Sequence, residues 1–270
     1  MPAALRLIHP APAAAVVALS AALAVILTRQ AGQPIDWRVA LIVLSVAGSQ
    51  VATGAFNDWA DRRRDASVRP EKPIPAGELT ASTAVAIGLV GLLTQLLSSA
   101  VLGPLPLLLG GIAVGAALVY DLALSRTPLS VLPYVVSFGL LPAWIATGIG
   151  VPVGRVVGAM LLVAPFAAAA HLANALRDFP LDSAGSSRNL AQLLGRARSH
   201  WLAVGLTLLV GLGVAAAFAV DDRLPPVSAL LGGIGLTAVA IGATGARRLW
   251  PAMLVAAVCW TIAWALATGG

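Results

Sequence analysis

Residues 39–65 read VALIVLSVAGSQVATGAFNDWADRRRD, an apolar run that passes directly into a dense group of acidic and basic side chains. Val39–Phe56 carries no charge and has about the length that one helical crossing of a bilayer needs. The polar part begins at Asn57 and continues to Asp65. This stretch predicts a membrane-spanning helix whose chemistry is concentrated at one end.

The composition of the whole chain agrees with this interpretation. Of 270 residues, 59% are hydrophobic and 10% are charged, whereas about a quarter of a soluble domain is charged. One aqueous core could not bury so much apolar side chain, which excludes an ordinary cytosolic enzyme, a disordered chain and a coiled coil. The net charge of +6 would fit a nucleic-acid binder, but the basic residues lie in short segments between apolar runs, so no nucleic-acid partner is expected. The single cysteine, Cys259, excludes a disulfide framework.

Charge-free stretches recur along the chain and predict an all-α, polytopic bundle of nine transmembrane helices in a single domain, residues 1–270. The predicted spans are Ala11–Thr28, Val39–Phe56, Thr80–Leu102, Leu105–Val119, Pro128–Thr147, Val156–Ala173, Trp201–Val220, Pro226–Thr244 and Pro251–Thr268. The segments between the spans at about 57–79, 120–128 and 174–200 are predicted to be catalytic loops.

The basic residues predict the orientation of this bundle. All but four of the 17 Lys and Arg residues lie at the N-terminus or after spans two, four, six and eight. The four exceptions are Arg29, Arg38, Arg155 and Arg223. Because positive charge favours the cytoplasmic side, we expect a multi-pass protein of the cell membrane with a cytoplasmic N-terminus, an outside C-terminus and a cytoplasmic site.

The pattern Asn-x-x-x-Asp-x-x-x-Asp occurs twice, within Asn57–Asp65 after the second span and within Asn174–Asp182 after the sixth. Two of the chain's three Asn residues therefore have Asp at both +4 and +8. A spacing of four places side chains on one face of a helix, although Pro180 is expected to break the second helix. Stacked acids destabilise a helix, which implies that something cationic binds between them.

The ligand types indicate which cation this is. Carboxylate and amide oxygens without nearby His or Cys suit Mg²⁺, which usually binds through one or two carboxylates and substrate phosphates. The first motif is followed by a proline-rich segment, Arg69–Gly77, in which Arg69 and Lys72 are candidate phosphate donors. Two facing acidic columns with basic residues between them predict a site for a diphosphate held by metal ions.

Other polar residues lie near the predicted joints. Tyr120, Asp121 and Arg126 follow the fourth span, where helix capping and ligand contact are equally good interpretations. Arg188 lies in a Gly/Ser segment and is a candidate phosphate contact. His171 precedes the second motif by one turn and is either a base or an ordinary hydrogen-bonding residue, whereas His9 and His200 are expected to be solvated. Four aromatic residues could stabilise a cation through their ring faces: Trp59, Tyr134, Phe138 and Trp144. Bundle packing or anchoring at the interface explains each of them more readily.

At these residues the chain resembles the UbiA superfamily of intramembrane prenyltransferases. The family's first signature, Asn-Asp-x-x-Asp-x-x-x-Asp, matches Asn57–Asp65, its Arg-Pro-x-x-Pro segment matches Arg69–Pro73, and its second aspartate motif matches Asp178–Asp182. Residues Tyr120–Pro128 resemble the family's short loop after the fourth helix. The resemblance covers essentially the whole chain.

The resemblance implies Mg²⁺-dependent ionisation of an isoprenyl diphosphate within the membrane lipid. It assigns catalytic and metal-binding roles to Asp58, Asp61, Asp65, Asp178 and Asp182. It assigns substrate binding to Asn57, Arg69, Lys72, Tyr120, Asp121, Arg126 and Asn174, and Arg188 is added as the candidate phosphate contact. Two departures weaken the match: Ala175 stands where many members carry an acid, and Ser125 stands where many carry a Lys, which Arg126 could replace.

Three functions remain open from sequence. The first is transfer of the prenyl group to an aromatic or other lipophilic acceptor. The second is a terpene cyclase of the same type, in which an internal double bond captures the cation and no acceptor is needed. The third and least favoured is a transporter or lipid-binding protein, because transporters tend to bind at the bilayer midplane and here the formal charges lie in the joints.

Overall fold

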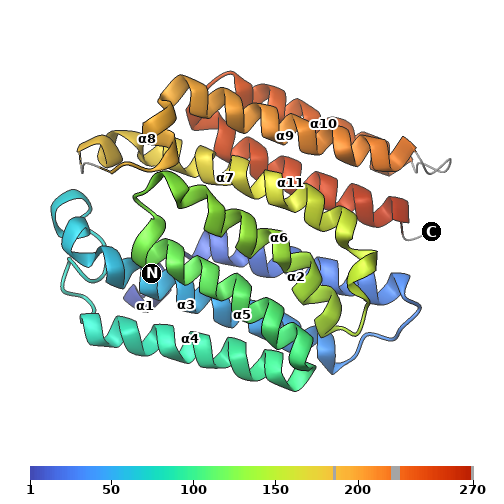
Figure 1. Ribbon diagram of the computed structural model, residues 1–270, viewed down its shortest axis with the longest axis horizontal. Helices are drawn as coiled ribbons and strands as arrows, with labels where there is room; N and C mark the ends of the chain where they lie inside the picture. The colour runs from blue at the N-terminus through green and yellow to red at the C-terminus, as the bar shows by residue number, and fades with distance from the viewer. Residues whose placement is uncertain (185–186, 220–225, 269–270) are drawn as a thin grey trace.

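The computed structural model describes residues 1–184, 187–219 and 226–268, and the regular structure in these ranges is entirely helical. The long helices lie side by side (Figure 1). The α-helices are α1 (Ala3–Leu7), α2 (Pro10–Gln30), α3 (Trp37–Val68), α4 (Ala81–Leu102), α5 (Pro104–Val119), α6 (Val131–Gly148), α7 (Val157–Ala184), α8 (Leu190–Leu194), α9 (Arg196–Ala219), α10 (Pro226–Ala243) and α11 (Ala246–Thr268). The short helices are a π-helix, η1 (Tyr120–Leu124), and two 3₁₀ turns, η2 (Pro128–Ser130) and η3 (Val153–Arg155).

Eight helices in the described residues are long and apolar enough to cross a membrane, which confirms the all-α polytopic class. They are α2, α3, α4, α5 with η1, α6 with η2, α7, α9 and α10. The ninth predicted span, Pro251–Thr268, lies within the 23-residue α11. Helix α1 and the end of α11 lie toward opposite ends of the bundle (Figure 1). The count of nine spans and the cytoplasmic orientation stay predictions. Val220, which ends the seventh predicted span, and Arg223, one of the basic residues used for the orientation, lie outside the described residues.

The predicted catalytic loops are largely helical. Helix α3 continues twelve residues past Phe56 to Val68, and α7 continues past Ala173 to Ala184. Pro180 lies inside α7, so the expectation that it breaks the helix is wrong. The change from apolar to polar side chains marks where a helix reaches the interface, and the backbone ladder continues through it because its hydrogen bonds do not depend on the side chains. Both acidic motifs are therefore presented on rigid helical turns.

Helix α3 is held in place by an unusually close contact with α4. A Cβ atom on Gly91 would lie 2.6 Å from Ala52 N, and one on Gly48 would lie 2.7 Å from the carbonyl oxygen of Gly91. Only glycine allows the two backbones to approach so closely, as is usual where membrane helices pack through small residues. This contact fixes the axis of the helix that carries the first motif.

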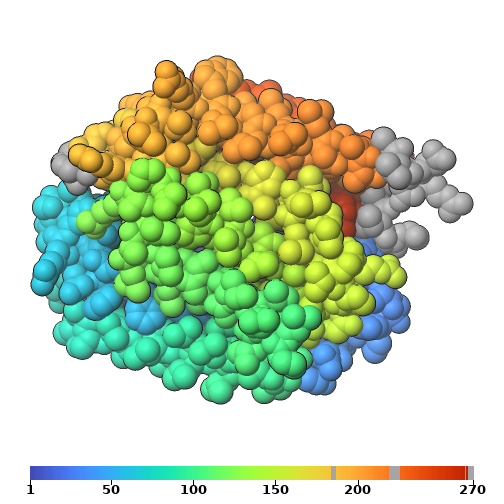
Figure 2. Space-filling model, in the orientation of Figure 1, coloured from blue at the N-terminus to red at the C-terminus, as the bar shows by residue number. Residues whose placement is uncertain are grey.

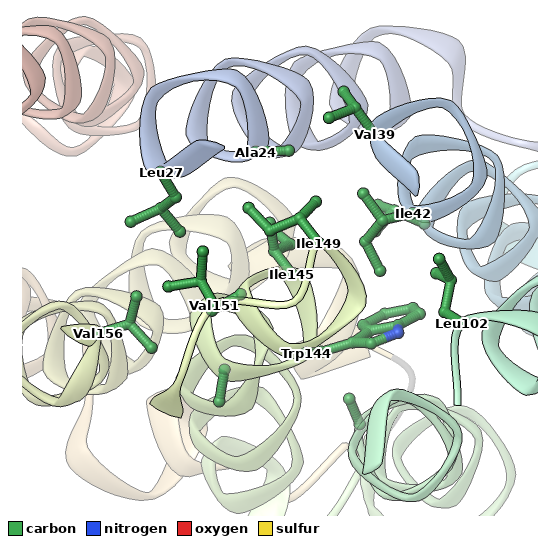
Figure 3. Packing of buried hydrophobic residues seen from close by; sticks show 14 of the residues in the cluster. Ala24, Leu27, Val39, Ile42, Leu102, Trp144, Ile145, Ile149, Val151 and Val156 are labelled. Atoms are coloured by element: carbon green, nitrogen blue, oxygen red, sulfur yellow. The ribbon is translucent and has the colours of Figure 1, made fainter. Parts of the chain in front are cut away.

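The largest core cluster joins α2, α3, α5 and α6 with Leu102 at the end of α4 (Figure 3). Trp144 lies at its centre, 2% exposed, and donates from Nε1 to Ser99 Oγ at 3.1 Å. Trp144 therefore packs in the core, in agreement with the packing interpretation of its ring. Side chains of α5, α6 and α7 (green to yellow) close one face of the bundle between α4 and α9 (Figure 2). Large apolar side chains such as Leu97 and Leu161 point outward, 65% and 71% exposed, which fits contact with lipid.

Candidate active site

The two acidic motifs lie at the same end of the bundle and face each other. They occupy the last turns of α3 and α7, beside α8 and the segment that joins α3 to α4 (Figure 1). One guanidinium connects them: Arg64 Nη2 lies 3.9 Å from Asp61 Oδ2, and Arg64 Nη1 lies 3.7 Å from Asp182 Oδ1. The structure therefore brings together the acids of two segments that are more than a hundred residues apart.

Lys72, the only lysine of the chain, lies between two carboxylates of the first motif. Its Nζ donates to Asp58 Oδ1 at 2.7 Å and to Asp65 Oδ2 at 2.8 Å. Asp58 and Asp65 are 2% and 0% exposed, so this ammonium compensates buried charge. Burial alone would lower the pKa of Lys72, but Asp58 and Asp65 outweigh it and raise that pKa above its usual value. The predicted phosphate donor is thus paired with the motif itself.

The remaining acids of the motifs are also paired with basic side chains. Arg69 Nη2 lies 2.6 Å from Asp178 Oδ1, which links the α3–α4 segment to α7. Burial would lower the pKa of Arg69, but Asp178 outweighs it and raises that pKa. Arg126 donates to Asp61 from the segment after η1. Each predicted phosphate donor from the two segments therefore contacts a predicted metal ligand.

Asn57 and Asp121 connect the first motif to the π-helix η1. Asn57 Nδ2 donates to Asp121 Oδ1 at 2.9 Å. A cavity of about 300 Å³ lies between these elements, lined by Ala60, Asp61, Asp121, Leu122, Ala123, Ser125 and Arg126. π-Helical turns are rare and frequently occur at functional sites. Asp121 and Arg126 both line this cavity, and their role in ligand contact stays a prediction.

Tyr120 lies on the inner side of η1 in a cluster of rings. Its ring centroid is 5.1 Å from that of Tyr134 and 5.8 Å from that of His171, both in edge-to-face contacts. His171 is 2% exposed, and its Nε2 lies 2.9 Å from Ser130 Oγ. The cluster forms an aromatic wall next to the acidic motifs, and His171 has the ordinary hydrogen bond that one of its two interpretations predicted.

Two predicted residues stand apart from these ion pairs. Asn174 is half-buried on α7, one turn before Asp178. Arg188 has an exposed side chain, and its backbone N–H donates to the Arg126 carbonyl oxygen at 3.1 Å. The roles assigned to both stay predictions, as does the ligand role of every acid in the two motifs. Residues 185–186, in the same predicted loop, lie outside the described residues.

The structure adds residues that the sequence did not single out. His9 Nε2 lies 3.2 Å from Asp58 Oδ1, a contact that the sequence did not predict, while the His9 side chain remains 42% exposed, as expected of a solvated residue. Its backbone has φ of +50°, and the preceding Ile8 packs so closely on Gly54 of α3 that a Cβ there would meet Ile8 Cα at 2.8 Å. The expectation that His200 is solvated is wrong: it is 8% exposed, and its Nε2 lies 3.0 Å from the Ala243 carbonyl oxygen. No local sequence pattern predicts the contact of His9 with Asp58 or that of His200 with Ala243, because both depend on how distant segments pack.

The carboxylates offer free oxygens that suit a hard cation. Asp58 Oδ2, Asp65 Oδ1 and Asp121 Oδ2 are buried without a hydrogen-bond partner among the described residues. In the same part of the chain no three His, Cys, Asp or Glu side chains converge on one point as a ready-made metal site. This combination fits Mg²⁺, whose shell is commonly completed by water and substrate phosphate rather than by a protein cage.

Fold and site together define a polytopic helical membrane protein with a paired acidic site at one end. The chain belongs to the UbiA prenyltransferase family, whose model matches residues 17–241. It is thus a member of a family of intramembrane prenyltransferases, as its motifs predicted. A search of curated proteins found no significant sequence match.

Solved structures share the fold over nearly their whole length. A digeranylgeranylglyceryl phosphate synthase aligns with TM-score 0.72 and 16% identity, over 98% of this chain and 97% of that chain. A UbiA homolog from Aeropyrum pernix K1 aligns with TM-score 0.72 and 17% identity, over 94% and 96%. A UbiA homolog from Archaeoglobus fulgidus, bound to GPP and Mg²⁺, aligns with TM-score 0.71 and 18% identity, over 98% and 99%.

Proposed function

We propose that the chain is a Mg²⁺-dependent prenyltransferase that ionises an isoprenyl diphosphate and transfers the prenyl group to an aromatic or other lipophilic acceptor. The observation that carries this proposal is the meeting of the two acidic motifs across Arg64, with Arg69, Lys72 and Arg126 paired to their acids. The Archaeoglobus fulgidus homolog bound to GPP and Mg²⁺ supports the choice of ligand.

The acids that would hold Mg²⁺ are Asp58, Asp61, Asp65, Asp178 and Asp182. Asp58 Oδ2 and Asp65 Oδ1, which accept no hydrogen bond among the described residues, support this assignment. When bound, Mg²⁺ would supply positive charge that stabilises the leaving diphosphate. In the structure these carboxylates are paired with the protein's own basic residues, which keeps the net buried charge low.

The basic residues would exchange partners when a diphosphate binds. Arg69, Lys72 and Arg126 donate to carboxylates in the structure and could donate instead to phosphate oxygens, Arg through two parallel bonds and Lys as a point charge. Their charge would stabilise the developing negative charge of the leaving group, the kind of interaction that usually makes the largest catalytic contribution. The exchange keeps every basic residue compensated in both states.

After the C–O bond breaks, the allylic cation must be kept from water. The apolar helices beside the site exclude water, and the rings of Tyr120 and Tyr134 stand next to the acidic motifs where a cation would form. The acceptor's nucleophilic carbon would then form the new bond to the prenyl group and lose its proton to the released diphosphate or to water. We further propose that this end of the bundle faces the cytoplasm, which the excess of Lys and Arg in its joints supports.

Purified protein in lipid nanodiscs, incubated with Mg²⁺ and a prenyl diphosphate, tests the proposal. The expected result is release of pyrophosphate and a prenylated product, detected by mass, only when an aromatic acceptor is present, and no reaction with EDTA. A cyclic hydrocarbon formed without acceptor would instead identify the terpene cyclase. Failure to consume prenyl diphosphates of every chain length tried, with or without acceptors, would contradict both and favour a lipid-binding or transport role.

A further inference from the structure

Asn189 is buried beside the second acidic motif, and the motif pattern assigns it no role. It precedes α8, is 4% exposed, and makes two hydrogen bonds with opposite ends of its amide. Its Nδ2 donates to Asp182 Oδ2 at 2.8 Å, and its Oδ1 accepts from the Gln192 N–H at 2.9 Å. Asn189 thus joins the start of α8 to the last acid on α7.

The orientation of this amide is determined by its partners. A backbone N–H can only donate, so the carbonyl oxygen of Asn189 must face Gln192. With the oxygen on that side, the NH₂ group at the other end of the amide faces Asp182, to which it donates. Rotating the amide by half a turn would break both bonds at once. The side chain therefore has one arrangement, and it points a donor at Asp182.

The segment around Asn189 is itself anchored on both sides. The Arg188 N–H donates to the Arg126 carbonyl oxygen at 3.1 Å, and the Leu190 N–H donates to Ser130 Oγ at 3.3 Å. Ser130 Oγ also lies 2.9 Å from His171 Nε2 on α7. Asn189 consequently stands on a backbone that is fixed to the segment after η1 and, through Ser130, to α7.

The contact leaves the two oxygens of Asp182 with different surroundings. Oδ2 is bound by the neutral amide, whereas Oδ1 lies 3.7 Å from Arg64 Nη1, on the side of the first motif. The amide of Asn189 is neutral, so it orients the carboxylate of Asp182 without cancelling its charge. Lys72, by contrast, places a positive charge between Asp58 and Asp65 that offsets their negative charges. The geometry directs Oδ1 of Asp182 toward the other motif.

We propose that Asn189 is the positioning residue of the second acidic motif: its amide holds Asp182 so that Oδ1 faces the diphosphate site. This inference rests on the proposed function. Partners that orient a metal-binding carboxylate typically contribute 10- to 100-fold to metal affinity. Asn189 is thus expected to contribute to ligand binding as well as to the capping of α8.

Asn189→Ser separates the two roles, since Ser caps a helix about as well as Asn but cannot reach Asp182 with an amide donor. Asn189→Asp also keeps a capping oxygen and places a second charge beside Asp182. Ser183→Ala is the matched control, because Ser183 is exposed, adjacent to Asp182 in sequence, and bonded to Phe179 and Gln192 instead. The measurements are calorimetric affinity for inorganic pyrophosphate with Mg²⁺, and the melting temperature without metal.

We expect Asn189→Ser to melt close to the wild type yet to bind Mg²⁺–pyrophosphate about 10- to 100-fold more weakly, with part of the affinity restored by excess Mg²⁺. Asn189→Asp should bind more weakly still, and Ser183→Ala should bind normally. Wild-type affinity in either Asn189 variant would overturn the inference alone, leaving Asn189 as a cap. A wild-type protein that does not bind Mg²⁺–pyrophosphate would overturn the proposed function and the inference together.

Discussion

Replacing Lys72 by Met removes the ammonium that lies between Asp58 and Asp65 and keeps a side chain of similar length. The two carboxylates are 2% and 0% exposed and would lose their bonds of 2.7 Å and 2.8 Å to Nζ. Removing one partner of a buried ion pair costs about 3–5 kcal/mol. The lower end applies here, because His9 and Arg64 also lie within 4.0 Å of these carboxylates. We therefore expect Lys72→Met to lose about 3 kcal/mol of stability when no Mg²⁺ is added.

In a thermal unfolding assay in detergent this loss corresponds to roughly 6–12 °C for a chain of this size. Adding Mg²⁺ should recover more of the melting temperature in Lys72→Met than in the wild type, since a cation can then occupy the space between the carboxylates. Lys72→Arg, which keeps the charge, is the control and should lose much less. A Lys72→Met protein that melts with the wild type and gains no more from Mg²⁺ would refute the reasoning that these acids form one cation site.

Further predictions concern pH, catalysis and packing. The pKa of Lys72 is raised above its ordinary 10.5. The contribution of Lys72 to the stability of the fold is therefore complete below pH 10.5 and disappears only as the pH rises through the raised pKa. The difference in melting temperature between wild type and Lys72→Met should be constant between about pH 7 and 9 and should shrink in stronger alkali. Asp61→Ala should lower pyrophosphate release by about 100-fold or more while melting remains cooperative; near-normal turnover would contradict the assignment. Gly91→Ala should cost about 1–3 kcal/mol in denaturant titrations, because its Cβ would lie 2.6 Å from Ala52 N, whereas Gly111→Ala, with nothing within 4 Å, should be neutral; equal stability of the two would be evidence against the tight α3–α4 contact.

The sequence predicted the helices and the motif residues because both leave local patterns. Val39–Phe56 is long and apolar enough to identify a span without any tertiary information. The spacing of four placed Asp61 and Asp65 on one helical face, and α3 does continue through them. Pro180 was misjudged because a proline's cost in a helix is set by its surroundings as well as by the residue, and α7 accommodates it.

The pairing within the site could not be predicted, because it depends on which segments meet in space. Arg69 and Lys72 carry the charge expected of phosphate donors, yet in the structure they bind Asp178 and Asp58. The sequence identified the charged residues without identifying the acids with which they pair. Asn189 and His9 were missed for a related reason: each acts across a tertiary contact, and neither belongs to a repeated spacing.

The central claim is that the motifs on α3 and α7 bind one diphosphate together. Calorimetric affinity for Mg²⁺ and a non-hydrolysable prenyl diphosphate analogue in Asp61→Asn, Asp178→Asn and the double variant tests this most directly. We predict that each single change weakens binding by at least about 10-fold. The double variant should lose clearly less affinity than the product of the two single-variant fold losses, since the effects of residues in one contacting network are not additive. Wild-type affinity in Asp178→Asn, or two losses that multiply as independent sites would, contradicts the claim.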